Sequence, residues 1–140
     1  MISQTAEYAL RAVVWLASHP DAALGTAQIA RAARVPAGYL SKVLQALARS
    51  GLVSSTPGRG GGFRLARPSE QISVLDVVEA VDPIQRIQQC PLGLERHGRD
   101  LCPLHRRLDD AARQIQEAFA DASIADLISE ETASPPLCER

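Results

Sequence analysis

Apolar residues recur at helical spacing through the first fifty positions. They lie three or four positions apart between residues 5 and 19, which predicts a first helix. A second, short helix is expected over residues 26–33 with Thr26 as its N-cap, and a third over residues 37–50. Pro36 cannot continue the second helix and suits the entry to the third. The pattern therefore predicts two helices joined by a tight turn, preceded by a longer helix.

The period then changes from helical to that of short strands. Residues 52–56 and 63–66 read as two strands, and the Gly-rich stretch 57–62 between them predicts a hairpin. Ser73 is placed to cap a further helix over residues 74–81. Helices, a tight turn, a longer helix and a hairpin follow one another in the order of a winged helix-turn-helix.

The C-terminal half contains one long amphipathic segment. Residues 84–103 show no period, residues 104–122 return to helical spacing, and Ser123 can cap a last helix over residues 124–128. The apolar side of the long helix is expected to pack on a second copy of itself or on the first helix.

We thus expect a mainly α fold with a small β-hairpin: a winged helix-turn-helix plus a long C-terminal dimerisation helix. Four regions follow. The first is a winged helix-turn-helix DNA-binding domain over residues 1–82, and the second is a Cys/His loop over residues 83–103. The third is the dimerisation helix with a short terminal helix over residues 104–130, and the last is a disordered tail over residues 131–140.

Composition limits the class of protein. The 140 residues are 46% hydrophobic, enough to build a core. The sequence has neither an apolar run long enough to cross a bilayer nor a signal-peptide pattern. We therefore expect a cytoplasmic protein without a membrane partner.

Charge divides the chain into two halves. Residues 1–67 carry eight basic and two acidic residues, a net charge of +6, whereas residues 68–140 carry a net charge of −7. The stretch from residue 22 to residue 69 contains no acidic residue. Chance clustering is the simple alternative, but the asymmetry indicates one half that faces a polyanion and one half with another task.

The predicted third helix carries candidate contacts to double-stranded DNA. In helix-turn-helix proteins the N-terminal part of this helix enters the major groove. Ala37 and Gly38 are small enough to allow close approach, while Tyr39, Ser41 and Lys42 can bond to bases or phosphates.

Further cations lie around that helix. Arg31 and Arg34 are candidates for phosphate contacts, and Arg59, between glycines in the hairpin turn, could enter a minor groove. The turn could also be simply a flexible tip. A nucleotide-binding loop is disfavoured because no Lys-Ser/Thr pair follows it.

Two cysteines and two histidines form a second constellation, Cys90, His97, Cys102 and His105. Thiolate and imidazole are the ligands of zinc and of mixed-ligand iron–sulfur clusters. Three cysteines in all argue against a disulfide framework. His97 could equally be a solvated loop residue, and His105 could pack at a helix start.

Several segments together resemble the Rrf-type winged-helix regulators, a family that includes the iron–sulfur regulator IscR and the nitric-oxide sensor NsrR. The matching segments are residues 2–11, 39–44, 51–55, 58–63, 72–77 and 79–81. The resemblance implies a homodimeric transcription factor that contacts DNA through residues 37–42 and Arg59. It also implies dimerisation through the long C-terminal helix.

Many members of that family bind an iron–sulfur cluster through three cysteines about six residues apart. Here Cys90 and Cys102 match the first and third cysteine and His105 matches the His of the IscR branch, but position 96 is Arg. One hypothesis is therefore a 2Fe–2S cluster completed by His97 or by Glu7 of the partner subunit. The others are a cofactor-free regulator controlled by thiol chemistry or a partner protein, and a zinc-stabilised interaction module without sensing.

A Cys–His pair can also act as nucleophile and base in an enzyme. No catalytic triad order, paired-carboxylate signature or nucleotide motif accompanies it, so we do not expect an enzyme. We expect a DNA-binding regulator that senses redox state, nitric oxide or iron–sulfur status through the loop from Cys90 to His105.

Overall fold

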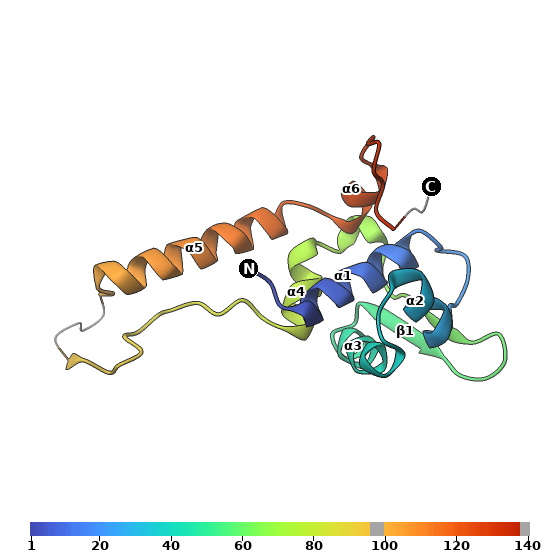
Figure 1. Ribbon diagram of the computed structural model, residues 1–140, viewed down its shortest axis with the longest axis horizontal. Coiled ribbons are helices and arrows are strands. Elements are labelled where there is room, and N and C mark those ends of the chain that lie inside the picture. The colour runs from blue at the N-terminus through green and yellow to red at the C-terminus, as the bar shows by residue number, and fades with distance from the viewer. Residues whose placement is uncertain (96–99, 138–140) are drawn as a thin grey trace.

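The computed structural model describes residues 1–95 and 100–137. It is mainly helical with one two-stranded antiparallel hairpin, as predicted (Figure 1). The elements in chain order are α1 (Gln4–Ala17), α2 (Thr26–Ala33), α3 (Ala37–Arg49), β1 (Val53–Thr56), β2 (Gly62–Leu65), the 3-10 turn η1 (Ser69–Gln71), α4 (Val74–Val81), α5 (Pro103–Ala120) and α6 (Ile124–Ser129).

Short-range capping decides where most helices begin. The hydroxyls of Ser3, Ser73 and Ser123 accept hydrogen bonds from backbone N–H groups in the first turns of α1, α4 and α6. The predicted cap at Thr26 is wrong by one residue, because Gly25 is the N-cap of α2. The Gln28 side chain accepts from the Gly25 N–H at 3.0 Å, so the capping bond comes from inside the helix.

One apolar core joins α1, α2, α3 and α4. Its fully buried large side chains include Leu16, Ile29, Leu40, Leu44, Leu47 and Val77. The three leucines of α3 lie three or four residues apart and therefore point inward together. This packing fixes which face of α3 is left to solvent.

The hairpin is attached to the helices through its second strand. β1 pairs with β2 in register from Val53 opposite Leu65 to Thr56 opposite Gly62. Phe63 also exchanges backbone hydrogen bonds with Leu24, at 2.7 and 2.9 Å. Gly62 has φ +142°, and a Cβ there would lie 2.5 Å from the Leu24 carbonyl group. The close approach of these two segments therefore requires glycine.

After α5 the chain returns to the core. Val74 N–H donates to Ala122 O at 2.9 Å and Ile124 N–H donates to Ile72 O at 2.8 Å, which places the starts of α4 and α6 side by side. Ile124 is fully buried in the common core. We call residues 1–82 together with α6 the head. The sequence grouped residues 104–130 as one region, whereas the structure separates α6, in the head, from α5.

The remainder forms an arm, which consists of residues 83–95 and 100–120. Figure 1 shows α5 projecting from the head, with residues 83–95 running alongside it. No residue of α5 is buried, and Leu104 and Leu108 are 62% and 52% exposed. The main head contact of α5 is with α4. The helix does not pack along α1, which was one of the two predicted arrangements.

The C-terminal residues were expected to be disordered. In the described part of this tail Leu137 is half-buried against the core and lines a groove with Trp15 and Arg31. Residues 138–140 lie outside the described residues.

Candidate nucleic-acid interface and sensor loop

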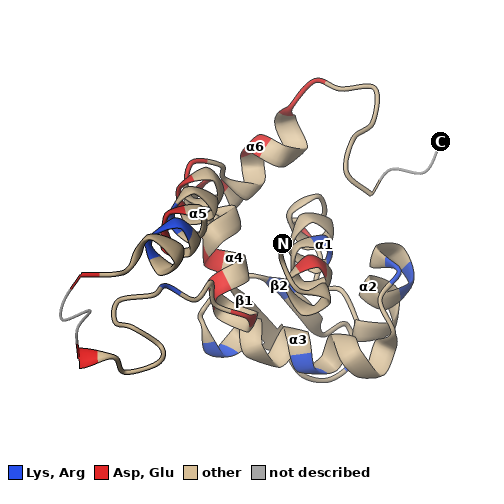
Figure 2. Cartoon of the chain, turned by 60° about the vertical axis from the view of Figure 1, so that its left-hand side comes forward, with Lys and Arg blue, Asp and Glu red and all other residues tan. Residues whose placement is uncertain are grey.

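The charge asymmetry of the sequence becomes a spatial one. In Figure 2, Lys and Arg lie on α2 and α3 and Asp and Glu lie on α4 and α6, whereas α5 carries both signs. The acid-free stretch of residues 22–69 contains both helices of the helix-turn-helix and the whole hairpin. A polyanion would therefore be attracted to the helix-turn-helix and the hairpin rather than to α4 and α6.

The first turns of α3 present the predicted contact residues to solvent. Ala37, Gly38, Ser41 and Lys42 are all exposed. The Ser41 hydroxyl donates to the Ala37 carbonyl at 3.3 Å. Two oxygen lone pairs of that hydroxyl remain available to accept further bonds. No acidic side chain lies within α3.

Tyr39 differs from the other residues of this helix start. It is 41% exposed, and its hydroxyl is hydrogen-bonded to the hydroxyl of Thr5 in α1. Its ring meets the Tyr8 ring edge-on, with centroids 5.5 Å apart and planes at 78°. The side chain is thus engaged with α1 as well as partly exposed.

The last turn and the C-cap of α2 carry two predicted phosphate contacts. Arg31 and Arg34 are both exposed, and Arg34 is the C-cap of α2 with φ +55°, a left-handed conformation. Arg11 of α1 donates to the carbonyl oxygens of Ala33 and Arg34, at 3.3 and 3.2 Å. These bonds satisfy acceptors that a helix end otherwise leaves unpaired.

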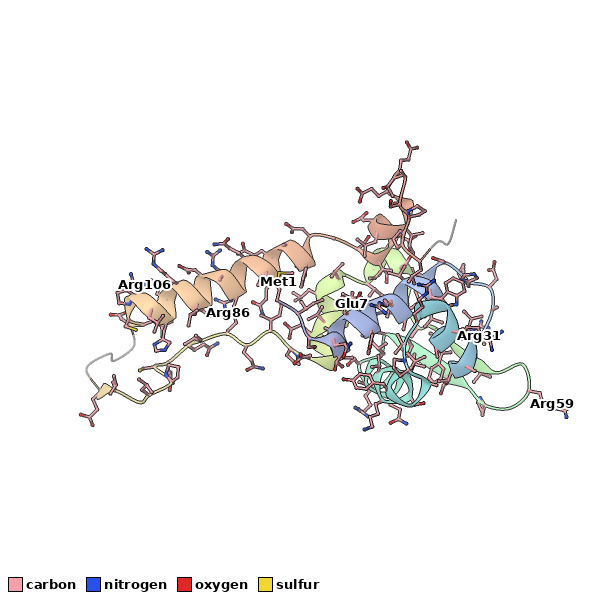
Figure 3. All side chains as sticks on the ribbon, viewed as in Figure 1. Met1, Glu7, Arg31, Arg59, Arg86 and Arg106 are labelled. Atoms are coloured by element: carbon pink, nitrogen blue, oxygen red, sulfur yellow. The ribbon has the colours of Figure 1, made fainter. Side chains whose placement is uncertain are left out.

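Arg59 lies at the tip of the hairpin. Gly58 and Gly60 on either side have φ values of +86° and +71°, which favour glycine. Figure 3 shows the Arg59 side chain at the outermost point of the hairpin, directed away from the head. A cation in this position is able to reach a groove next to the one that α3 would occupy.

The Cys/His loop and the start of α5 contain one close pair. Cys102 is the N-cap of α5 and Pro103 is in its first turn. The Cys102 Sγ lies 3.3 Å from the His105 Nδ1, and both side chains are half-buried. Their spacing of three residues at the start of a helix places both side chains on one side of its first turn.

The other predicted ligands do not join that pair. Among residues 1–95 and 100–137, no three His, Cys, Asp or Glu side chains gather closely enough to hold one metal ion. Cys90 is half-buried elsewhere in the loop, and His97 lies outside the described residues. Glu7 is engaged with Arg11, whose Nε lies 2.8 Å from a carboxylate oxygen. The described residues of one chain therefore do not fit a cluster as they stand.

Sequence reasoning missed a polar network that fastens the arm together. Arg86 donates to both carboxylate oxygens of Asp109 on α5, at 2.7 and 2.9 Å, and the Ile87 N–H adds a third bond at 2.8 Å. Arg86 also donates to Gln116, which bonds to Glu79 of α4 at 3.4 Å. The hydrogen bonds from Arg86 and from the Ile87 backbone lower the pKa of Asp109 to about 2. No local signal predicts a pair 23 residues apart with one partner in a segment without periodicity.

Comparison with known proteins identifies the family. A family model described as Rrf2, iron-dependent transcriptional regulator, matches residues 2–130. An HTH-type transcriptional regulator of Aquifex aeolicus is 31% identical over 132 residues, which cover 92% of each chain. This chain therefore belongs to the Rrf2 family of transcriptional regulators, as the sequence resemblance implied. The members of this family are regulators rather than enzymes, which agrees with the expectation from sequence.

Solved structures show the same fold at lower identity. IscR of T. potens is 23% identical and has a TM-score of 0.74 over 91% of this chain and 85% of its own. CymR of B. subtilis, described as a global cysteine regulator, is 23% identical with a TM-score of 0.76 over 94% and 98%. An oxidised form of CymR from Staphylococcus aureus is 21% identical, with a TM-score of 0.73 over 95% and 99%. None of the helices in the described part of the chain combines the length and apolar character needed to span a bilayer.

Proposed function

We propose that this chain is a homodimeric DNA-binding regulator whose operator affinity depends on the redox state of the loop from Cys90 to His105. The observation that supports DNA binding most strongly is the exposed start of α3 and the Arg59 hairpin on a stretch of 48 residues without acid. The start of α3 enters the major groove and Arg59 enters an adjacent minor groove. Arg31, Arg34 and Lys42 neutralise phosphates.

The proposed dimer contact is the apolar seam of α5. Leu104, Leu108, Ala111, Ile115 and Ala118 follow alternating spacings of four and three residues, which is the period of a coiled coil. The seam is largely exposed in the single chain, and a helix without a buried residue gains little from folding alone. Packing of this seam against the same seam of a second subunit would bury its apolar side chains and so stabilise a helix that projects from the head.

The proposed sensor is the Cys102–His105 pair. The imidazole lies close enough to exchange a proton with the thiol. A hydroperoxide then oxidises the thiol to a sulfenic acid and is itself reduced to the alcohol or to water. Loss of the thiol–imidazole contact at the start of α5 shifts the arm, and the two heads change their spacing.

A 2Fe–2S cluster is the second candidate, favoured by the match to a family described as iron-dependent. Cys90, Cys102 and His105 would be its ligands, together with His97 or Glu7 of the partner subunit. The described residues do not gather as such a set in one chain. A cluster therefore requires a rearranged loop or a ligand from the second subunit. A structural zinc ion also needs four ligands, so a zinc site would have the same requirement.

DNA binding is tested by fluorescence anisotropy with a duplex selected by the wild-type protein from a random-sequence library. The affinity should fall steeply with salt, and Arg59→Ala should lower the salt slope by about 1. Glu95→Ala, a charge change in the acidic half, serves as control and should leave the slope unchanged. Failure to bind any duplex at low salt would contradict the proposal.

The sensor is tested with protein purified without oxygen. Iron, sulfide and zinc assays with a visible spectrum separate a cluster, a zinc site and a metal-free thiol. For the metal-free thiol, hydrogen peroxide should change the operator affinity of wild type and of Cys138→Ser, but not that of Cys102→Ser. An unchanged peroxide response in Cys102→Ser would rule out Cys102 as the sensor.

A further inference from the structure

The side chain of Tyr39 spans the gap between the helix that would read DNA and α1. It is the third residue of α3, where a tyrosine hydroxyl could contact a base or a phosphate. That hydroxyl is instead bonded to Thr5, which is 34 residues earlier in the chain. The edge-on contact with Tyr8 holds the ring as well. Both ends of the Tyr39 side chain are therefore engaged by the first two turns of α1.

The same two turns hold the residues just before α3. The Arg11 guanidinium lies over the Tyr8 ring, 5.3 Å from its centroid. It reaches on to the carbonyl oxygens of Ala33 and Arg34, while Glu7 binds its Nε. Thr5, Tyr8 and Arg11 thus form one connected surface of α1, which we call the α1 brace. It contacts the turn and the start of the recognition helix together.

The other end of this region faces the arm. Met1 and Ile2, immediately before α1, line a groove of about 320 Å³ with Leu108 and Ile115 of α5. Figure 3 shows Met1 between the arm and α1, and Glu7 further along α1 toward α3. The segment before α1 therefore lies beside the arm, and the α1 brace that follows it in the chain contacts the start of α3.

We propose that Tyr39 and Arg11 are positioning residues: the α1 brace sets the angle at which the start of α3 meets DNA, and neither side chain reads the duplex. This rests on the proposed DNA-binding function. Tyr39 acts through its bond to Thr5, and Arg11 acts by holding the end of α2. A change in the position of α1 relative to the arm is then carried to α3 through these contacts.

A double-mutant cycle separates positioning from direct contact. Tyr39→Phe and Thr5→Val each remove one hydroxyl and keep the shape of the side chain. If the hydroxyl positions α3, each variant should weaken operator binding about five-fold, the scale of one hydrogen bond. The double variant should be no weaker than either single variant, because all three lose the same bond.

Two outcomes of this cycle overturn the proposal for Tyr39. A loss in Tyr39→Phe with no loss in Thr5→Val means that the hydroxyl contacts DNA. Wild-type affinity in both variants means that the bond has no role in binding. Circular dichroism and thermal unfolding of each variant confirm that the head is folded.

Arg11 is tested against Lys42, since Arg11→Gln and Lys42→Gln each remove one positive charge. Lys42→Gln should lower the salt slope of binding by about 1, as expected for a lost phosphate contact. Arg11→Gln should weaken binding about ten-fold with the slope unchanged. A slope lowered equally by both variants would make Arg11 a phosphate contact and overturn its role in the brace.

The same titrations distinguish failure of the α1 brace from failure of DNA binding. If the wild-type protein binds no duplex at low salt, the DNA-binding function itself fails. If the wild-type protein binds and the Arg11 and Tyr39 variants bind equally well, only the α1 brace fails.

Discussion

The head and the arm are built on opposite principles. The head buries a continuous set of aliphatic side chains, mainly from α1 to α4, and its buried residues include no polar or charged side chain among those described. The arm buries no residue of α5. Only Ile84 and Phe119 among its described residues pack against the core, and hydrogen bonds between Arg86, Asp109, Gln116 and Glu79 hold it to itself and to α4. Burial of apolar area contributes more to the free energy of unfolding than exposed ion pairs and hydrogen bonds do.

The difference separates two roles. A densely packed head keeps α3 and the hairpin in one arrangement, which reading a duplex requires. An arm fastened by exposed polar contacts can change its position at small free-energy cost. The loop that contains Cys90 and Cys102 lies in this arm, so a chemical change there acts on the part of the molecule whose helix has no buried residue.

The largest effect is expected in the head. Leu44→Ala removes a fully buried side chain of α3 and should lower the free energy of unfolding by about 3 kcal/mol. Leu92→Ala removes a side chain of the same size that is 72% exposed on the arm and lies outside the α5 seam, and should leave the unfolding of the head nearly unchanged. Urea unfolding followed by the fluorescence of Trp15, the one tryptophan of the sequence, measures both. Equal losses in the two variants would remove the distinction between head and arm.

An intermediate effect is expected on assembly. Ile115→Asp places a charge in the apolar seam of α5. It should weaken dimerisation at least ten-fold, because the partner helix would remove water from that charge without pairing it. Gln114→Asp makes the same substitution on the exposed side of the same helix and should leave the dimer intact. Sedimentation velocity over a range of concentrations reports both. Dimers of unchanged stability in Ile115→Asp would place the interface elsewhere.

The smallest effect is expected at the polar fastening of the arm. Since its pKa in the folded protein is about 2 against an ordinary value of 3.8, the charge on Asp109 stabilises the folded state fully above about pH 4 and less as the pH falls toward 2. Asp109→Asn should therefore have a lower Tm than wild type at pH 7, with a gap that narrows below pH 4.

The neighbouring Asp110→Asn is the matched control for that gap. Asp110 is 51% exposed and lies 3.9 Å from Arg113. An exposed ion pair of this kind contributes little, so its removal should leave Tm almost unchanged at every pH. A gap in Asp109→Asn that stays constant from pH 7 to pH 3 would show that Asp109 does not act through its charge.

Much of the head followed from local sequence. Helical period, serine caps and the Gly-rich turn predicted α1, α3, α4 and the hairpin within one or two residues, because these signals act over four residues or fewer. The predicted roles of Arg31, Arg34, Arg59 and the loop ligands stay predictions. The exposure of the three arginines agrees with the proposal, but the contacts they would make lie outside a single chain.

What the sequence determined by itself was the set of local elements, the separation of charge between the halves and, through its motifs, the family. Only the tertiary structure decided that Tyr39 bonds to Thr5, that Arg86 binds Asp109 and that α6 returns to the head. Local signals depend on neighbours in the chain. These contacts join residues 34, 23 and about 50 positions apart, which meet only after the core has fixed the path of the backbone between them.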